Sequence, residues 1–269
     1  MKIINKSLFK VTASSSWLIG LIIFLVMIMY LGIIISMFDP DDVEAIKAMV
    51  EMMPEELIAA MGFAEIGATL TSFIASYFYN FLAIMFPIIY CISVAYRLVG
   101  KHVDRGSMAY LLATPSSRRK IILTQALYLL ISLTVLFLLI FLAGFLFSRL
   151  LFPGQLEVGN FLLLNLSTLV IFYAVSGICF FFSCLFNNGS YSLAFGTAVP
   201  VAFFVLRMLA NLGDNFAWLG YFSLFSLIDP MEVARGNLAL GTGIILPLII
   251  ALFMYGAAVI VFERRSLPL

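Results

Sequence analysis

The residues of this chain whose types and spacing suggest a chemical role lie in one basic segment, residues 97–120. Six of its residues are Lys or Arg, and Asp104 is its only acid. Met108, Leu111 and Leu112 follow at i, i+3 and i+4, so they share one side of a short helix. Such a helix needs a surface that receives its apolar side. The segment therefore predicts docking, onto a partner or onto the membrane interface, and not catalysis.

Motifs for catalysis or nucleotide binding are missing from the sequence. It contains no G-x-x-x-x-G-K-[ST], no H-E-x-x-H and no G-x-S-x-G. The single His102 cannot build a metal site alone. All three cysteines lie in or at the ends of apolar runs, so we expect small buried side chains and not a disulfide framework.

The composition places the chain in a membrane. Of its 269 residues, 64% are hydrophobic and 11% are charged, whereas soluble domains carry about 25% charged residues. Six apolar runs are long enough to cross the bilayer, and backbone groups in lipid must be paired within each segment. We therefore predict an all-α, polytopic protein with a single transmembrane domain over residues 1–269. The predicted spans are residues 17–37, 70–96, 121–147, 161–186, 191–209 and 241–262.

The first sixteen residues are basic and amphipathic. Lys2, Lys6 and Lys10 form one stripe, and most apolar residues lie opposite, with Phe9 as the exception. This pattern is typical of a helix in the headgroup layer. The alternative is a signal peptide, but the following apolar run has no A-x-A site and is long for one. We expect an interfacial helix followed by an uncleaved first span.

The loops predict the orientation. Four Lys or Arg residues lie on one side of the predicted membrane: Lys47, Arg149, Arg207 and Arg235. Eleven lie on the other: Lys2, Lys6, Lys10, Arg97, Lys101, Arg105, Arg118, Arg119, Lys120, Arg264 and Arg265. The positive-inside rule therefore predicts that both termini are cytoplasmic.

Two loops are predicted on the outer side. Residues 39–66 are acidic and carry two helix starts, at residues 39–42 and 54–56. Residues 211–240, called the oily loop here, are rich in apolar and aromatic residues. This composition predicts a re-entrant or interfacial helical hairpin in which a helix begins again at Asp229-Pro230. Its aromatic residues would anchor it at the interface or cap a substrate exit. These candidates are Trp218, Tyr221, Phe222 and Phe225.

The fifth predicted span carries small residues at four-residue spacing. Ala194, Ala198 and Ala202 continue a stripe that begins at Ser190. Small residues let helices approach closely in lipid, so the stripe forms a subunit interface or packs within the monomer. No Asp, Glu or Lys lies inside a span, and we expect Arg149 and Arg207 to snorkel from span ends. Without an ion relay or a nucleotide site, any transport takes its energy from a partner.

Four segments resemble the permease subunit of ABC-2-type transporters. Residues 104–118 resemble the family's E-x-x-x-G-T-x-x-x-L-L-x-x-P-x-x-R coupling segment, although the family's acid is usually Glu and stands somewhat earlier than Asp104. Residues 120–125 resemble the entry into span three, where Gln125 stands at a position that is often Lys. Residues 218–230 resemble the family's oily loop. Residues 262–267 resemble F-x-x-R-D-L, with Ser266 for the Asp.

The resemblance implies a mechanism. Two permease subunits, identical or different, would form the pore in membrane lipid above two cytoplasmic ABC ATPase subunits, which bind ATP and Mg; this chain would bind no cofactor. Residues 101–117 would hold a coupling helix seated in the ATPase. The implied contacts are Asp104, Arg105, Met108, Leu111, Leu112, Thr114 and Pro115. The expected work is export of amphipathic or hydrophobic peptides, drugs or lipid-like molecules across the plasma membrane, with no nucleic acid involved.

Two other classes of function remain open from the sequence. A membrane scaffold or assembly factor has no need of a coupling segment but is compatible with six spans. An intramembrane enzyme predicts clustered polar residues at membrane depth, which the sequence does not show.

Overall fold

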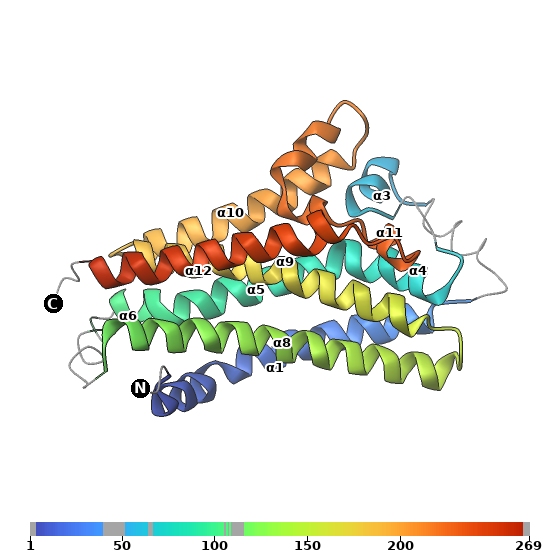
Figure 1. Cartoon of the computed structure of the whole chain (residues 1–269). Helices are drawn as coiled ribbons and strands as arrows, with labels where there is room; N and C mark the ends of the chain where they lie inside the picture. The colour runs from blue at the N-terminus through green and yellow to red at the C-terminus, as the bar shows by residue number, and fades with distance from the viewer. Residues whose placement is uncertain are drawn as a thin grey trace.

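Six membrane-length helices build the protein. The computed structural model describes residues 4–39, 52–63, 67–104, 106, 108 and 116–265, and this part contains six helices long and apolar enough to cross a membrane and no β-strand (Figure 1). The predicted all-α membrane fold is therefore confirmed. Five spans are α1 (Lys6–Ser36), α8 (Arg118–Leu151), α9 (Val158–Leu185), α10 (Gly189–Ala210) and the pair η5 (Gly241–Ile245) and α12 (Leu246–Arg264).

The remaining span, Leu70–Asp104, is interrupted twice by wider π-helical turns. It consists of α4 (Leu70–Ile74), η1 (Ala75–Leu82), α5 (Ala83–Ala95), η2 (Tyr96–Gly100) and α6 (Lys101–Asp104), of which η1 and η2 are π-helices. π-Helical turns are rare and occur frequently at functional sites. The first of them carries Asn80, which becomes important below.

Helix α9 is the centre of the bundle. It contacts α12, α10, α8 and α5, and it is the most buried of the six spans, whereas α10 is the least buried. Helices α9 and α10 are joined by a short turn in which the Asn188 side chain accepts a hydrogen bond from the Ser190 amide at 2.8 Å, and the two helices pack on each other. All three cysteines are buried and free, as predicted.

The amphipathic start of the chain and the first span form one helix. Helix α1 begins at Lys6 with Asn5 as its N-cap and continues to Ser36. Its first turns pack on α8: Thr12 donates to the buried Gln125 side chain at 3.2 Å, and Phe9 meets Tyr128 edge-to-face at 5.6 Å. Phe9 is thus not a misfit of an interfacial stripe, because it is the aromatic residue that fixes this segment to its neighbour.

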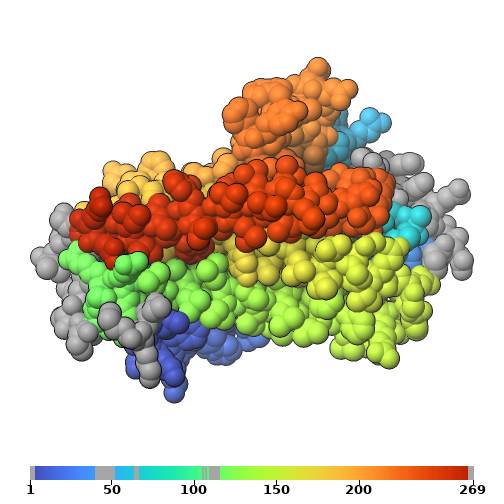
Figure 2. Space-filling model, in the orientation of Figure 1, coloured from blue at the N-terminus to red at the C-terminus, as the bar shows by residue number. Residues whose placement is uncertain are grey.

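The two ends of the bundle differ. Both termini lie at one end, here called the terminal end, and the opposite end is called the distal end (Figure 1). At the distal end lie α3 (Glu55–Met61), the 3₁₀-helices η3 (Ala217–Phe222) and η4 (Leu224–Leu227), and α11 (Pro230–Ala234). Figure 2 shows that the segment after α10 stands out from the surface of the bundle.

The oily distal segment differs from the predicted helical hairpin. It forms two 3₁₀-helices and the five-residue α11 in place of two longer helices. Ser223 and Ile228 are extended and interrupt the helical runs. The predicted restart at Asp229-Pro230 is present, because Asp229 caps α11 and Pro230 occupies its first turn. Likewise Pro54 precedes α3 as predicted, whereas the start predicted at residues 39–42 falls mostly outside the described residues.

Candidate functional site

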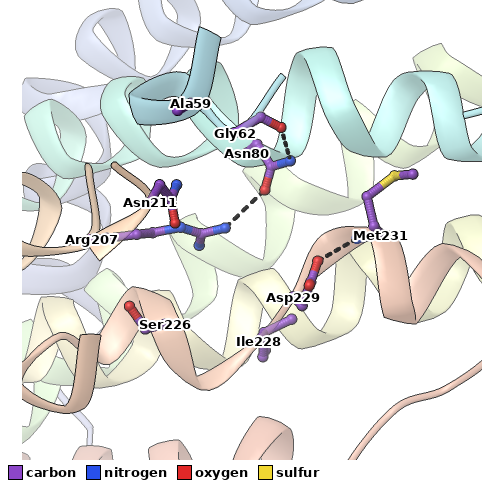
Figure 3. A pocket seen from close by; sticks show the side chains of 9 residues that line it. All are labelled: Ala59, Gly62, Asn80, Arg207, Asn211, Ser226, Ile228, Asp229 and Met231. Carbon is purple, nitrogen blue, oxygen red and sulfur yellow. Dashed lines mark hydrogen bonds between the residues drawn. The ribbon is translucent and has the colours of Figure 1, made fainter. Parts of the chain in front are cut away.

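A polar pocket opens at the distal end, between α3, η1, α10 and the segment from η4 to α11. Its volume is about 330 Å³, which is at the small end of ligand sites. The described residues that line it are Ala59, Gly62, Asn80, Arg207, Asn211, Ser226, Ile228, Asp229 and Met231 (Figure 3). Five of these side chains are polar or charged. The pocket therefore stands out in a chain whose spans are almost wholly apolar.

Arg207 organises the pocket. Its side chain comes from the last turn of α10, and the residue is only 9% exposed. One Nη donates to the Phe225 carbonyl at 2.5 Å, and the other donates to Oδ1 of Asn80 at 2.8 Å. The expectation that Arg207 snorkels is therefore wrong. Oxygen atoms of two other segments accept hydrogen bonds from the guanidinium inside the protein, so the side chain does not extend toward water.

Asn80 connects this arginine to α3. Its Nδ2 donates to the Gly62 carbonyl at 2.9 Å while its Oδ1 accepts from Arg207. Gly62 ends α3 with a φ of +75°, a left-handed conformation that glycine adopts without strain. One side chain on a π-helical turn thereby joins the distal helix, the second span and the fifth span. Sequence reasoning missed this site, because residues 80 and 207 are far apart and neither belongs to a motif.

The pocket holds two opposite charges, the buried Arg207 and the exposed Asp229. Asp229 is exposed, and its Oδ1 accepts a hydrogen bond from the Met231 amide at 2.9 Å. It attracts the Arg207 guanidinium electrostatically, but no ion pair joins these two residues. Next to the pocket, hydrogen bonds from Asn237 and Arg235 lower the pKa of the half-buried Glu232 below its ordinary value.

The predicted coupling segment lies at the terminal end and is described only in part. Asp104 is exposed, and its side chain lies against the start of α10: a Cβ added to Gly189 would stand 2.8 Å from Cβ of Asp104. Met108 is 4% exposed and belongs to the chain's own hydrophobic core. The other predicted contacts fall outside the described residues: Arg105, Leu111, Leu112, Thr114 and Pro115.

Comparison with known proteins gives one finding that decides the family. A family model described as ABC-2 family transporter protein matches residues 3–267, which is nearly the whole chain. The chain belongs to the ABC-2 transporter family. A search of curated proteins and of solved structures finds no significant match.

Membership of the ABC-2 family fixes the broad role of this bundle. The protein is a multi-pass membrane permease, and permeases of this family work with a partner ATPase subunit because they have no ATPase domain of their own. This agrees with the absence of a phosphate-binding loop from the sequence. In the residues that the structure describes, no cluster of His, Cys, Asp and Glu is placed to hold a metal ion.

The small residues of this ABC-2 permease lie on the free side of α10. Ser190, Ala194, Ala198 and Ala202 are all exposed. Their exposure favours the subunit interface over packing within the monomer. Contact with a second subunit stays a prediction.

The aromatic residues of the oily segment separate into two groups. Trp218, Tyr221 and Phe222 on η3 are 56%, 91% and 63% exposed, and their role as an interfacial anchor or an outer cap stays a prediction. Phe225 on η4 is 1% exposed and packs on Phe172 of α9, with ring centroids 5.8 Å apart. Phe225 thus helps to hold the pocket, because its carbonyl accepts from Arg207.

A second arginine organises the terminal end. Arg265 follows α12 and donates to the Cys184 carbonyl at 2.6 Å, and it also donates to the Phe186 carbonyl and to the Asn187 side chain. Arg118, at the start of α8, donates to the Arg265 carbonyl at 2.7 Å. Burial lowers the pKa of the Arg265 guanidinium below its ordinary value. The basic C-terminus therefore joins the ends of α8, α9 and α12, in addition to supplying positive charge.

Proposed function

We propose that the protein is the membrane-spanning subunit of an ATP-driven exporter, and that it moves amphipathic or hydrophobic molecules outward. The observation that carries the proposal is the ABC-2 family match over residues 3–267, in a chain with six spans. Energy comes from a separate ATPase chain, because this sequence contains no motif that binds ATP. ATP and Mg bind to that partner.

The ATPase sits at the terminal end in this proposal. Eleven of the fifteen Lys and Arg residues belong to loops and termini on that side of the sequence topology, which makes it cytoplasmic by the positive-inside rule. In this proposal residues 101–117 supply the seat for the ATPase. Since Met108 is buried in the permease itself, Leu111 and Leu112 supply the apolar surface for the partner, while Asp104 and Met108 connect the segment to the bundle.

The complex holds two permease subunits, identical or different, and two ATPase subunits. Helix α10 is the least buried span and presents its small residues outward, which supports a subunit contact through Ala194, Ala198 and Ala202. The substrate cavity lies between the two permeases and is lined by the spans that contain α1, α5 and α10. The exposed aromatic residues of η3 cover its distal exit in the plasma membrane.

The test is the substitution Leu111→Asp. Burying a Leu contributes about 1.5–3 kcal/mol, and a carboxylate in an apolar groove adds a desolvation cost. A loss of about 3 kcal/mol weakens ATPase binding more than a hundredfold, at about 1.4 kcal/mol per tenfold. We expect the tagged Leu111→Asp permease to reach the membrane normally but to lose the copurifying ATPase and its substrate-stimulated ATP hydrolysis.

The matched control is Val11→Asp. Val11 also lies at the terminal end, is 66% exposed and stands outside the coupling segment, so this variant should capture the ATPase as the wild type does. Normal capture and normal hydrolysis by Leu111→Asp would contradict the proposed seat. Absence of any copurifying ATPase from the wild-type permease would favour a scaffold that does not transport.

A further inference from the structure

The distal pocket has the properties of a binding site that neither the family nor the proposed transport cycle assigns. Its floor is formed by Arg207, Asn80 and the buried side chains of Ile228 and Met231, and its mouth by the exposed Asn211, Ser226 and Asp229. Figure 3 shows the guanidinium of Arg207 extended toward Asn80 and the side of the pocket that carries Asp229. A buried cation therefore lies beneath an exposed carboxylate.

Arg207 has hydrogen-bonding capacity left. A guanidinium carries five N–H donors, and its two hydrogen bonds, to Phe225 and Asn80, use two of them. A buried cation with spare donors binds a phosphate or carboxylate strongly, because the planar guanidinium matches the geometry of paired oxygen atoms. The floor of the pocket is therefore suited to an anionic group.

The mouth of the pocket is suited to an amine. The oxygen atoms of Asp229, Asn211 and Ser226 can accept hydrogen bonds from a primary ammonium group, which has three donors and no acceptor. The charges of Arg207 and Asp229 are opposite and make no direct ion pair. A zwitterion pairs with both of them, whereas a ligand with a single charge would pair with one and lie beside a like charge.

The surroundings place this pocket at the level of lipid headgroups. The segment η3 packs on α10, with Gly220 beside Ala210 at the end of that helix, and its exposed Trp218, Tyr221 and Phe222 form an aromatic group typical of the membrane interface. About 330 Å³ is enough for a headgroup but not for a whole lipid. An acyl chain attached to the bound group would therefore remain outside the pocket, in the membrane.

We propose that the distal pocket binds a phosphate linked to a primary amine, with the phosphate on Arg207 and the ammonium on Asp229. Phosphatidylethanolamine is the lipid that carries this group, and glycerophosphoethanolamine is its soluble counterpart. Binding needs neither the ATPase nor transport, so it goes beyond the proposed function and is tested on the permease alone.

The experiment titrates the purified full-length permease, delipidated in detergent, with three short-chain lipids. These carry ethanolamine, choline or glycerol on the phosphate, and occupancy is followed by native mass spectrometry with the thermal shift read in parallel. We expect the ethanolamine lipid to bind about tenfold more tightly than the other two, equivalent to about 1.4 kcal/mol. Choline lacks N–H donors, and the glycerol headgroup has no charge to pair with Asp229.

The decisive variant is Asp229→Asn. Asparagine caps helices as well as aspartate does, so the variant keeps the bond to the Met231 amide and the fold while losing the charge. We expect it to bind the ethanolamine lipid about tenfold more weakly and the glycerol lipid no more weakly than the wild type. Arg149→Gln, at the exposed distal end of α8, removes one charge outside the pocket and should change nothing.

Two results would overturn the proposal: equal binding of the three lipids to the wild type, or an unchanged ethanolamine preference in Asp229→Asn. Competition with glycerophosphoethanolamine distinguishes the source. Weak competition supports a membrane lipid whose acyl chains add affinity. Competition as strong as that of the lipid supports the same pocket chemistry with a soluble ligand.

Discussion

At the scale of single residues, Arg207 and Asn80 matter most in the distal half of the protein. A guanidinium within a span is costly unless oxygen atoms satisfy it, and here the oxygens come from Asn80 and the Phe225 carbonyl. Asn80 also satisfies the Gly62 carbonyl. Removing this one side chain leaves a buried donor and an acceptor unpaired, so its contribution to stability exceeds that of an ordinary surface amide.

We therefore expect Asn80→Ala to lower the free energy of unfolding by roughly 1–3 kcal/mol, the cost of an unsatisfied buried polar group. Thermal unfolding of the purified permease in detergent measures the change. Asn211→Ala is the matched control, since Asn211 lines the same pocket but is exposed and makes one long bond of 3.5 Å to the Ala60 carbonyl. Equal melting of the two variants would show that Asn80 does not hold Arg207 in place.

At the scale of elements, the terminal ends of three helices meet at Arg265. The last carbonyls of a helix have no partner inside that helix, and Arg265 supplies one for the end of α9 by binding the Cys184 and Phe186 carbonyls. Its own carbonyl accepts from Arg118 of α8. Arg265 therefore holds the ends of α8, α9 and α12 together on the side where the ATPase is proposed to sit.

Arg265→Ala should destabilise the permease by about 1–3 kcal/mol, because hydrogen bonds to a charged group are lost and helix carbonyls are left unpaired. The adjacent Arg264→Ala is the control. Arg264 is exposed and should change stability by less than about 0.5 kcal/mol. Thermal unfolding of both variants in detergent measures the change in stability. A loss of stability in Arg264→Ala as large as that in Arg265→Ala would refute the capping role.

Helix α10 carries the second prediction at this scale. If a second subunit covers its small residues, Ala198→Leu blocks close approach and should weaken the dimer about tenfold, equivalent to about 1.4 kcal/mol. Size-exclusion chromatography with light scattering over a dilution series measures this. Gly256→Leu on α12 adds similar bulk at an exposed position with open space around it and should leave the dimer intact. An unchanged dimer in Ala198→Leu would assign the stripe to lipid contact.

At the scale of the whole molecule, the membrane orientation decides which end meets the ATPase. The bundle places the start of α1 and the end of α12 at one end, and α3 with the polar pocket at the other. The positive-inside rule predicts that the terminal end is cytoplasmic. All three native cysteines are buried, so an introduced surface cysteine can be labelled against a low background.

A cysteine in place of Met52, which is 85% exposed at the distal end, should react with an impermeant thiol reagent added to intact cells. A cysteine in place of the exposed Ser117, at the start of α8, should react only after the cells are opened. The reverse pattern would invert the topology and remove the proposed ATPase seat from the cytoplasm.

The class of fold follows from the amino-acid sequence. Apolar runs of membrane length must become helices, because lipid offers no partner to unpaired backbone groups, so six spans followed from composition and length alone. The start of α11 at Pro230 and the burial of Cys91, Cys179 and Cys184 could also be predicted from the local sequence. The family was also readable from short segments, and it is confirmed over residues 3–267.

The contacts of the polar side chains became visible with the folded chain. Arg207 looked like a snorkelling residue, because a position near a span end is all that sequence shows. Its burial depends on Asn80 and Phe225, which come from other segments. Phe9 and Met108 were similarly assigned to surfaces and proved to pack within the chain. Hydrophobic periodicity gives the side of a helix that prefers an apolar neighbour, but the neighbour itself is chosen by long-range packing, which is why the distal pocket appeared only with the fold.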